Sequence, residues 1–238
     1  LAVIGSRSAN EGDLQFTRQV GAKAASEGIA IVSGGARGVD ETAMLGAVEE
    51  GGPTIGVMAD SLLKAATSAK WRKGLMDGNL VLVSPFYPEA GFSAGNAMAR
   101  NKYIYCLADS SLVIHSGKKG GTFNGAKENL KHGWVPLWVK PTDDPAAANT
   151  DLVNQGGYWC KSRPDKISVR ELLECPSPNG HQVTESNDLF AEQSQPTLFS
   201  AKEETTDFAT DNEDSSAGAE PSDFYHIFLQ ELARLAEE

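Results

Sequence analysis

The stretch Ile29-Ala-Ile-Val-Ser-Gly-Gly-Ala-Arg-Gly-Val-Asp40 decides how this chain folds. A short β-branched run stops at Ser33, two glycines follow, and after Arg37 the pattern becomes that of a helix. A strand that ends in a glycine-rich turn and opens a helix presents free backbone N–H groups, and the helix dipole adds positive potential there. The guanidinium of Arg37 has the planar fork that suits phosphate. The turn therefore predicts a site for an anion, and phosphate fits it best.

Two further segments have the same construction. Leu1-Ala-Val-Ile-Gly-Ser-Arg7 is a strand followed by a glycine, a hydroxyl and a guanidinium. Leu112-Val-Ile-His-Ser-Gly-Lys-Lys-Gly-Gly-Thr122 is a strand followed by glycines and two lysines, with Thr122 placed to cap the next helix. One such turn is weak evidence, because glycine there often serves packing alone. Three of them, which would converge at the carboxyl edge of a parallel sheet, favour a shared phosphate site.

Short runs rich in valine and isoleucine alternate along the chain with helical patterns. The runs are typical of buried parallel strands and lie at Leu1–Ile4, Ile29–Val32, Thr54–Met58, Leu80–Val83, Leu112–Ile114 and Trp134–Val139. The helical patterns lie at Asp13–Glu27, Val39–Glu50, Ser61–Asp77, Gly95–Ala108 and Thr122–His132. This alternation predicts an α/β fold with a doubly wound, mostly parallel Rossmann-like sheet of about six strands and right-handed crossovers.

Composition divides the chain into three parts. Residues 1–175 form the α/β domain, which ends with an aromatic turn at Gly156–Trp159 and helical character at Ile167–Leu173. Residues 176–221 are polar and acidic, and we expect a disordered linker because they have too little apolar surface to offset the entropy of ordering. Residues 222–238 regain a helical apolar stripe, which predicts a short amphipathic helix that docks on the chain's own core or on a partner.

The charge of the chain is unevenly distributed. The full sequence has 238 residues and a formal net charge of −11, but the part from Glu171 onward contains two basic and 16 acidic residues. The first 170 residues therefore carry a net charge of +3. The negative net charge of the whole chain is therefore compatible with an N-terminal domain that binds a polyanion. The acidic tail would either compete with that polyanion or serve as a solubilising linker.

Several classes of protein are excluded by what the sequence lacks. Three widely spaced cysteines without a CxxC pair argue against a disulfide framework and a zinc site, and they suit the reducing cytoplasm. No apolar run approaches the ~20 residues of a membrane span. No nucleophile–base pair or metal-ligand spacing occurs, and we interpret Asp40 and Asp109 as turn and helix-cap residues, so we expect a binding protein without metal or cofactor. The chain opens in mid-strand at Leu1 without a methionine, and we expect further residues upstream.

Basic and aromatic residues lie around the predicted turns. Arg100-Asn101-Lys102 open an apolar helix, and basic side chains at a helix N-terminus oppose the dipole, so we favour phosphate contacts over a solvated first turn. For Lys118-Lys119, a solvated loop and a nucleic-acid contact are equally good interpretations. The loop aromatics Phe86, Tyr87 and Phe92 either stack on bases or fold back onto the core.

Four motifs in their order and spacing resemble the Rossmann-like domain of the DprA (Smf) DNA-processing proteins. They are Gly5-Ser6-Arg7, Ser33 to Asp40, Arg100-Asn101 and Ser116-Gly117, and the resemblance extends from Leu1 to about Cys160. In that family the domain binds single-stranded DNA, and in well-known members it helps to load a RecA-type recombinase. The resemblance implies an accessory protein of DNA processing and recombination whose partners would be single-stranded DNA, a RecA-type recombinase and further copies of itself.

The resemblance also implies which residues hold the phosphate backbone, namely Arg7, Arg37, Arg100 and the backbone of Ser33–Gly35. Together with the third turn, the set expected at the carboxyl edge is Gly5, Ser6, Arg7, Ser33, Gly34, Gly35, Arg37, Arg100, Asn101, Lys102, Ser116, Gly117, Lys118, Lys119, Gly120, Gly121 and Thr122. The chain departs from the family at Met44, where a histidine is common, in the third turn, and in showing no winged-helix pattern. These departures indicate a divergent branch.

The LOG-type phosphoribohydrolases of the same superfamily provide the alternative function. These enzymes release a base from a nucleoside monophosphate and carry an Arg ahead of an Ala-Asp, as Arg100 and Ala108-Asp109 are arranged here. They also need Gly-Gly-x-Gly-Thr-x-x-Glu, but the third residue after Thr122 is Gly125, and Glu128 falls on a different helix face. Without that carboxylate, general acid–base help at the sugar is lost. Nucleotide binding or hydrolysis is therefore the second hypothesis.

Within the expected linker, Gln195-Pro-Thr-Leu-Phe199 is similar to the pentapeptide by which many bacterial DNA-maintenance proteins bind the replicative sliding clamp. An unfolded segment would offer Leu198 and Phe199 to an apolar pocket, while Gln195 would fix the direction by hydrogen bonds. Five-residue matches also arise by chance, and the stretch could dock on the chain's own core instead. The sliding clamp is thus a candidate partner.

Overall fold

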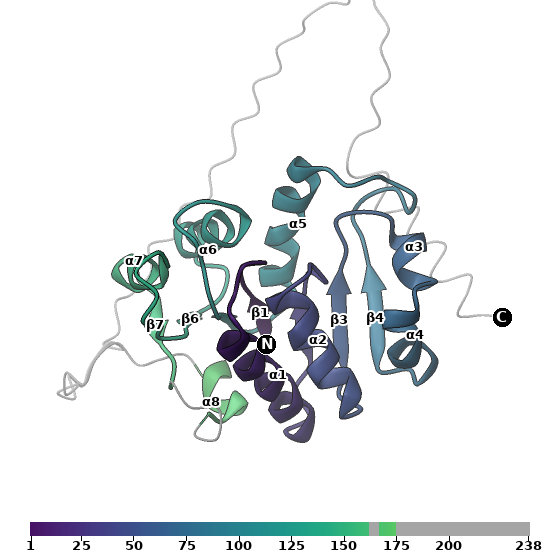
Figure 1. The fold of residues 1–238 in the computed structure, drawn as a ribbon, viewed down its shortest axis with the longest axis horizontal. Coiled ribbons are helices and arrows are strands. Elements are labelled where there is room, and N and C mark those ends of the chain that lie inside the picture. The colour runs from purple at the N-terminus through teal and green to yellow at the C-terminus, as the bar shows by residue number, and fades with distance from the viewer. Residues whose placement is uncertain (162–166, 175–238) are drawn as a thin grey trace, which may run out of the picture. The chain divides into compact units, whose positions relative to one another are not determined.

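A computed structural model describes residues 1–161 and 167–174 (Figure 1). The expected linker at 176–221, the expected helix at 222–238 and the peptide Gln195–Phe199 lie outside the described residues, so all three stay predictions. None of the helices in the described part has the length and apolar character that crossing a membrane requires.

Seven parallel strands form one sheet in the order β4-β3-β2-β1-β5-β6-β7. The strands are β1 (Ala2–Ile4), β2 (Ile31–Ser33), β3 (Thr54–Val57), β4 (Leu80–Val83), β5 (Ser111–Val113), β6 (Leu137–Val139) and β7 (Tyr158–Trp159). Ala2 of the central strand lies beside Val32 on one side and Ser111 on the other. The chain therefore winds outward from β1 in both directions, which confirms the predicted doubly wound architecture.

The seventh strand is absent from the sequence prediction. β7 has two residues, too few to show an apolar run, and it pairs with β6 so that Tyr158 lies beside Trp138. The sequence predicts a turn and aromatic packing at this point, and the ring centroids of Trp138 and Tyr158 do lie 5.7 Å apart. The sheet thus has seven strands where we expected about six.

Eight helices occur in the described part of the chain. They are α1 (Glu11–Ser26), α2 (Val39–Glu49), α3 (Leu62–Ala66), α4 (Ala69–Met76), α5 (Ala94–Cys106), α6 (Gly121–His132), α7 (Asn149–Asn154) and α8 (Val169–Leu173). The single helix predicted at Ser61–Asp77 is wrong, because α3 and α4 are separate. The Thr67 hydroxyl donates to the Leu63 carbonyl at 3.0 Å and the Ser68 hydroxyl to the Ala65 carbonyl at 2.8 Å, and such side-chain bonds compete with helix continuation.

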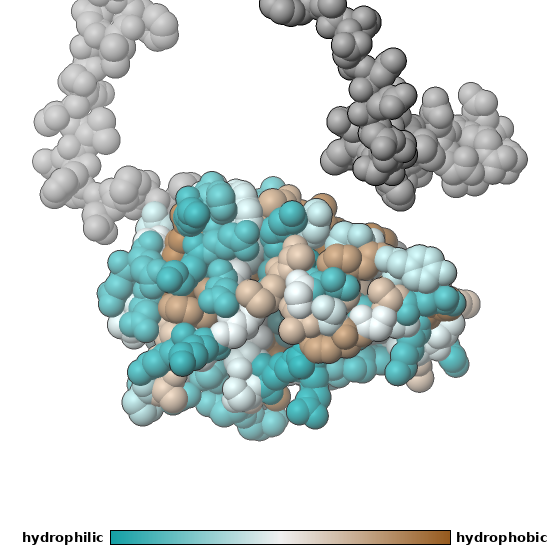
Figure 2. Space-filling model, turned by 90° about the horizontal axis from the view of Figure 1, so that it is seen from above, coloured by the Kyte–Doolittle hydropathy of each residue, from teal (hydrophilic) through white to brown (hydrophobic). Residues whose placement is uncertain are grey.

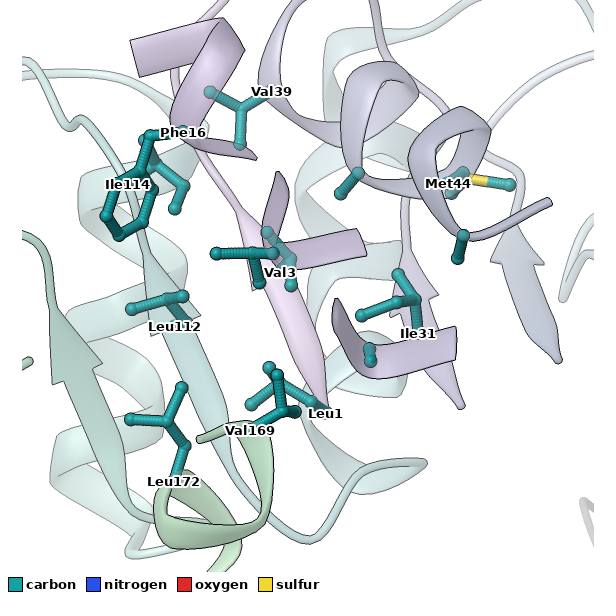
Figure 3. Packing of buried hydrophobic residues seen from close by; sticks show 14 of the residues in the cluster. Leu1, Val3, Phe16, Ile31, Val39, Met44, Leu112, Ile114, Val169 and Leu172 are labelled. Carbon is teal, nitrogen blue, oxygen red and sulfur yellow. The ribbon is translucent and has the colours of Figure 1, made fainter. Parts of the chain in front are cut away.

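Helices cover both faces of the sheet (Figure 1). On one face α1, α2 and α8 pack on the strands, as Figure 3 shows for Leu1, Val3, Phe16, Ile31, Val39, Met44, Leu112, Ile114, Val169 and Leu172. On the other face α5, α6 and α7 contribute Ile104, Tyr105, Ala126 and Leu152 to a second core. Full burial of one leucine or isoleucine stabilises a fold by about 1.5–3 kcal/mol. The two cores hold the sheet rigid and so fix the positions at which the loops at its carboxyl edge begin and end.

The winding direction of the chain reverses between β1 and β5. The loop after β1 leads to α1 on one face of the sheet, whereas the loop after β5 leads to α6 on the other face. Where neighbouring parallel strands send their loops to opposite faces, a crevice opens above the sheet, and open α/β sheets bind ligands there. The turns at Gly5–Arg7 and Lys119–Thr122 border this crevice.

Candidate nucleic-acid interface

Two cavities open at the carboxyl edge of the sheet. The first, of about 330 Å³, is lined by the turn after β2, and the second, of about 460 Å³, by the turns after β1 and β5. They share Arg7, Ala36, Phe92, Ala97 and Arg100. The structure thus brings together the three turns singled out in the sequence. Seen from above, this side of the molecule shows apolar side chains next to hydrophilic ones (Figure 2).

The turn after β2 depends on glycine. Gly35 has φ 63° and Gly38 has φ 99°, in the left-handed region that favours glycine. A Cβ at Gly38 would lie 3.0 Å from the carbonyl oxygen of Ser6, so this turn touches the turn after β1. Arg37 is exposed at the wall of the first cavity, where its guanidinium is free to meet a ligand from solvent.

Arg100 lies beneath both cavities and is only 5% exposed. Its Nη1 donates to the carbonyl oxygen of Gly34 at 2.7 Å and also to that of Val57. Within the described part of the chain, no carboxylate lies within 4.0 Å of this guanidinium, and its Nε has no hydrogen-bond partner. Burial lowers the pKa of Arg100 and Asp40 opposes this effect, but arginine stays protonated in proteins. A buried positive charge therefore adjoins both cavities without a carboxylate contact.

The structure places Arg100 elsewhere in its helix than we expected. The helix α5 begins at Ala94 and is capped by the Ser93 hydroxyl, which accepts from the N–H of Asn96. Arg100 therefore lies in the middle of the helix and not in its first turn, so the unfavourable dipole that we invoked does not apply. Its burial beside two carbonyl groups and two cavities is a stronger reason to expect an anion there.

The turn after β1 contributes an exposed arginine to the site, and the loop between β4 and α5 contributes an exposed aromatic ring. The guanidinium of Arg7 lies over the ring of Phe92, 5.5 Å from its centroid, and both residues line both cavities. Phe92 is 59% exposed and Tyr87 is 71% exposed, so these two loop aromatics do not fold back onto the core. Phe86 is half-buried.

Asp40 has a different place from the one expected of a turn residue. It lies in the first turn of α2, is only 5% exposed, and lines the second cavity. Its Oδ1 accepts the backbone N–H of Gly5 at 3.3 Å, so this N–H, which we assigned to a phosphate, already has an acceptor. Burial raises the pKa of Asp40 to about 6, against the lowering effect of Arg100 and of the N–H groups of Gly5 and Gly34.

The turn after β5 divides into a buried and an open half. Ser116 is buried, and its N–H donates to Asn149 Oδ1 at 2.9 Å. The open half consists of Lys119–Thr122, which lines the second cavity at the N-terminus of α6. Thr122 was expected to cap this helix, which is wrong: the cap position is Gly120, with φ 116°, and Thr122 is the second helical residue.

The remaining predicted residues differ in how close they lie to the cavities. Asn101 lines the second cavity, and its Nδ2 donates to the carbonyl oxygen of Gly121 at 3.1 Å, which ties α5 to the start of α6. Lys102 and Lys118 are exposed and line neither cavity. Ser33 is buried in the sheet, where its hydroxyl donates to the Val3 carbonyl at 2.6 Å. The roles of these residues stay predictions.

The position where a phosphoribohydrolase would carry its glutamate is a buried glycine. A Cβ at Gly125 would lie 3.3 Å from Asn101 Nδ2 and 3.5 Å from Tyr105 Cε2, so a longer side chain has little room. Glu128 is exposed and lines a separate cavity with Lys127 and His132. Neither Gly125 nor Glu128 therefore supplies the carboxylate that the sequence motif of this type of hydrolase requires at this position.

A sequence model of the DNA recombination-mediator protein A family matches residues 1–170. The chain belongs to this family. The chain is 30% identical over 170 residues to protein Smf of Escherichia coli, a match that covers 70% of this chain and 46% of the relative. The chain spans less than half the length of the curated relatives that it matches.

Two solved structures of the family share the fold. DNA processing protein A of Helicobacter pylori, which binds single-stranded DNA, superposes with a TM-score of 0.60 at 24% identity over 72% of this chain and 79% of that one. DNA processing protein A of Streptococcus pneumoniae gives a TM-score of 0.59 at 23% identity over 68% of this chain and 58% of that one. At these identities the likeness concerns the fold alone.

Proposed function

We propose that residues 1–175 bind single-stranded DNA at the carboxyl edge of the sheet, as part of an accessory protein for DNA processing and recombination. Phosphates of the strand would contact Arg7 and Arg37 from solvent and the N-terminus of α6 at Gly120–Thr122. Family membership supports the role in DNA processing, and single-stranded DNA is the ligand of the Helicobacter pylori protein.

One observation carries the proposal, namely the buried guanidinium of Arg100. Buried charges in proteins are paired or hydrogen-bonded, because an uncompensated charge in a low dielectric is costly. Among the described residues, Arg100 donates hydrogen bonds only to carbonyl groups, and the carboxylates of Asp40 and Asp60 act on it from more than 4.0 Å away. It also adjoins two cavities open to solvent, and a phosphate in either cavity would bring a negative charge close to the guanidinium.

An exposed aromatic ring at the cavities favours a single strand over a duplex. Phe92 lines both cavities and supports the guanidinium of Arg7, and Tyr87 is exposed in the same loop between β4 and α5. Unpaired bases stack on such rings, with a contribution of about 1–3 kcal/mol per base, whereas bases in a duplex are stacked on each other. A strand held by its phosphates at the two arginines would therefore bring a base to Phe92.

The proposal extends to a cytoplasmic location and to three partners besides DNA. A RecA-type recombinase and further copies of the chain are inferred from the family alone. The sliding clamp is inferred from Gln195, Leu198 and Phe199, which lie outside the described residues.

Arg37→Ala tests the proposed function, because Arg37 is exposed and its loss leaves the turn intact. We expect the affinity for a fluorescent single-stranded oligonucleotide to fall more than tenfold in an anisotropy titration, with a shallower dependence on salt. Arg72→Ala is the matched control, since Arg72 is also exposed but lies on α4 and lines neither cavity. Equal affinities of the two variants would contradict the proposal. Release of free base from nucleoside monophosphates, followed by chromatography, would instead support the hydrolase.

A further inference from the structure

A carboxylate stands inside the predominantly basic second cavity. The charged side chains that line this cavity are Arg7, Arg100 and Lys119 together with Asp40. Asp40 is held in place, because its Oδ1 accepts the N–H of Gly5 at 3.3 Å and the residue is only 5% exposed. Any anion that enters the cavity therefore meets three positive charges and one fixed negative charge.

The surroundings of Asp40 come from three elements. Arg100 and the buried Tyr105 face it from α5, Arg7 from the turn after β1, and the N–H of Gly34 from the turn after β2. The Tyr105 hydroxyl is buried and has no hydrogen-bond partner among the described residues. The positive groups offset the charge of Asp40 only in part, since burial keeps the pKa of this carboxyl well above its usual range, at about 6.

Phosphate esters differ in the charge that they bring to such a cavity. A phosphodiester carries one negative charge, whereas a phosphate monoester has a second pKa near 6 and carries about two negative charges above neutrality. A cavity of 460 Å³ is about 10 Å across if it is spherical, which is no more than one Debye length at 0.1 M salt. The second charge of a monoester would therefore be repelled by Asp40 with little screening.

We infer that Asp40 weakens the binding of phosphate monoesters to the second cavity more than that of phosphodiesters, and so biases the site toward the interior of a DNA strand and away from free nucleotides. The inference rests on the proposed function, because it assumes that the cavity takes a phosphate. It adds a specificity-determining residue that neither family membership nor the shared fold assigns. A cell contains abundant nucleotides with terminal phosphates, so a DNA site with arginines alone would be open to them.

The test compares two probes that differ by one methyl group, thymidine 5′-monophosphate and its methyl ester. Each is titrated directly into the full chain at pH 8 and followed by NMR chemical shifts of the protein. Asp40→Asn keeps an acceptor for the N–H of Gly5 but loses the charge. We expect the ratio of the affinity for the methyl ester to the affinity for the monoester to be at least fivefold higher in the wild type than in this variant. Asp143→Asn removes a charge from an exposed residue after β6 and should keep the wild-type ratio.

A second measurement needs no variant. The methyl ester does not titrate between pH 5 and 8, so the pH dependence of its affinity reports on the protein. As the pH falls through 6, Asp40 takes up a proton and the repulsion disappears, so the affinity of the wild type for the methyl ester should rise severalfold. A flat profile, or equal probe ratios in the wild type and Asp40→Asn, would overturn the inference.

Failure of the inference about Asp40 can be distinguished from failure of the DNA-binding proposal. An oligonucleotide titration on the same samples reports DNA binding independently of the small probes. A change in the probe ratio between the wild type and Asp40→Asn, without DNA binding, would support the role of Asp40 and contradict the DNA-binding proposal. DNA binding with the same probe ratio in both proteins would support the DNA-binding proposal and contradict the role of Asp40.

Discussion

Arg100 and Gly34 are fitted to each other across 66 residues of sequence. The Nη1 of Arg100 donates to the carbonyl oxygen of Gly34 at 2.7 Å, and a Cβ at position 34 would overlap the guanidinium group. The glycine at this position thus serves close approach by a side chain, whereas Gly35 and Gly38 serve the backbone conformation of the turn. The arginine in turn links the ends of β2 and β3 through Gly34 and Val57.

Gly34→Ala should therefore destabilise the protein although alanine is the smallest possible replacement. We expect a loss of about 2 kcal/mol or more in the free energy of unfolding, because the methyl group would displace a buried guanidinium. Urea denaturation measures this value. Gly91→Ala is the control, since its Cβ would meet nothing within 4 Å, and it should change stability by less than about 0.5 kcal/mol. Equal stabilities of the two variants would refute the fit between Gly34 and Arg100.

Arg100→Ala and Arg37→Ala should both weaken DNA binding but differ in their effect on stability. Removing Arg100 leaves the carbonyl oxygens of Gly34 and Val57 without their donor, at about 1–3 kcal/mol for each unsatisfied group. Arg37 is exposed, so its loss should cost less than about 0.5 kcal/mol. Thermal denaturation measures the effect of each variant on stability, and the oligonucleotide titration measures its effect on DNA binding. A fully stable Arg100→Ala would mean that Arg100 does not hold the turn.

The unfolding free energy should carry a pH-dependent contribution from Asp40. Its pKa is about 6 in the folded state against 3.8 for an ordinary aspartate, so the folded state binds the proton more tightly. The contribution therefore stabilises the folded state fully below about pH 4 and is lost as the pH rises to about 6. Over this range, the free energy of unfolding should fall by up to about 3 kcal/mol on account of Asp40. Asp40→Asn should lack this slope. Unfolding curves from pH 3.5 to 7 measure it, and parallel profiles for wild type and variant would exclude the raised pKa.

A tail peptide containing Gln195–Phe199 should bind purified sliding clamp at hundreds of micromolar or below, as a short segment that orders on binding. Replacing Leu198 and Phe199 by alanine in the same peptide should abolish the interaction, because these side chains would enter the apolar pocket. Isothermal calorimetry measures both peptides. Failure of the unmodified peptide to bind at these concentrations would make the motif a chance match.

The parts of the candidate site that consist of neighbouring residues in the chain could be predicted from the sequence. A β-branched run, a glycine-rich turn and a basic residue are adjacent in the chain, so the turns at Gly5–Arg7 and Ser33–Gly38 could be recognised one at a time. Their convergence followed from the rule that parallel strands end at one edge. The two-residue β7 and the break between α3 and α4 were missed, because a short strand has no period and the break depends on the hydroxyls of Thr67 and Ser68.

The contacts between distant residues could not be predicted in the same way. That Arg100 is buried follows from the packing of α5 against the ends of β2 and β3, where this side chain bonds the carbonyl groups of Gly34 and Val57. Asp40 accepts the hydrogen bond of the Gly5 N–H because α2 approaches the end of β1. A turn motif specifies which groups are presented, but neighbouring elements decide which of them remain free for a ligand.

The central strand β1 has a consequence for the order in which the protein matures during synthesis. It pairs with β5, so that Ala2 lies beside Ser111, and the turns on the two sides of the second cavity are separated by more than 100 residues. At about 5–20 residues per second, a ribosome needs roughly 5–20 s to make that length of chain. A nascent chain would carry Arg7 and Arg37 throughout this interval without the wall formed by α6. Under the proposed function, the second cavity would therefore become complete only after α6 has been made.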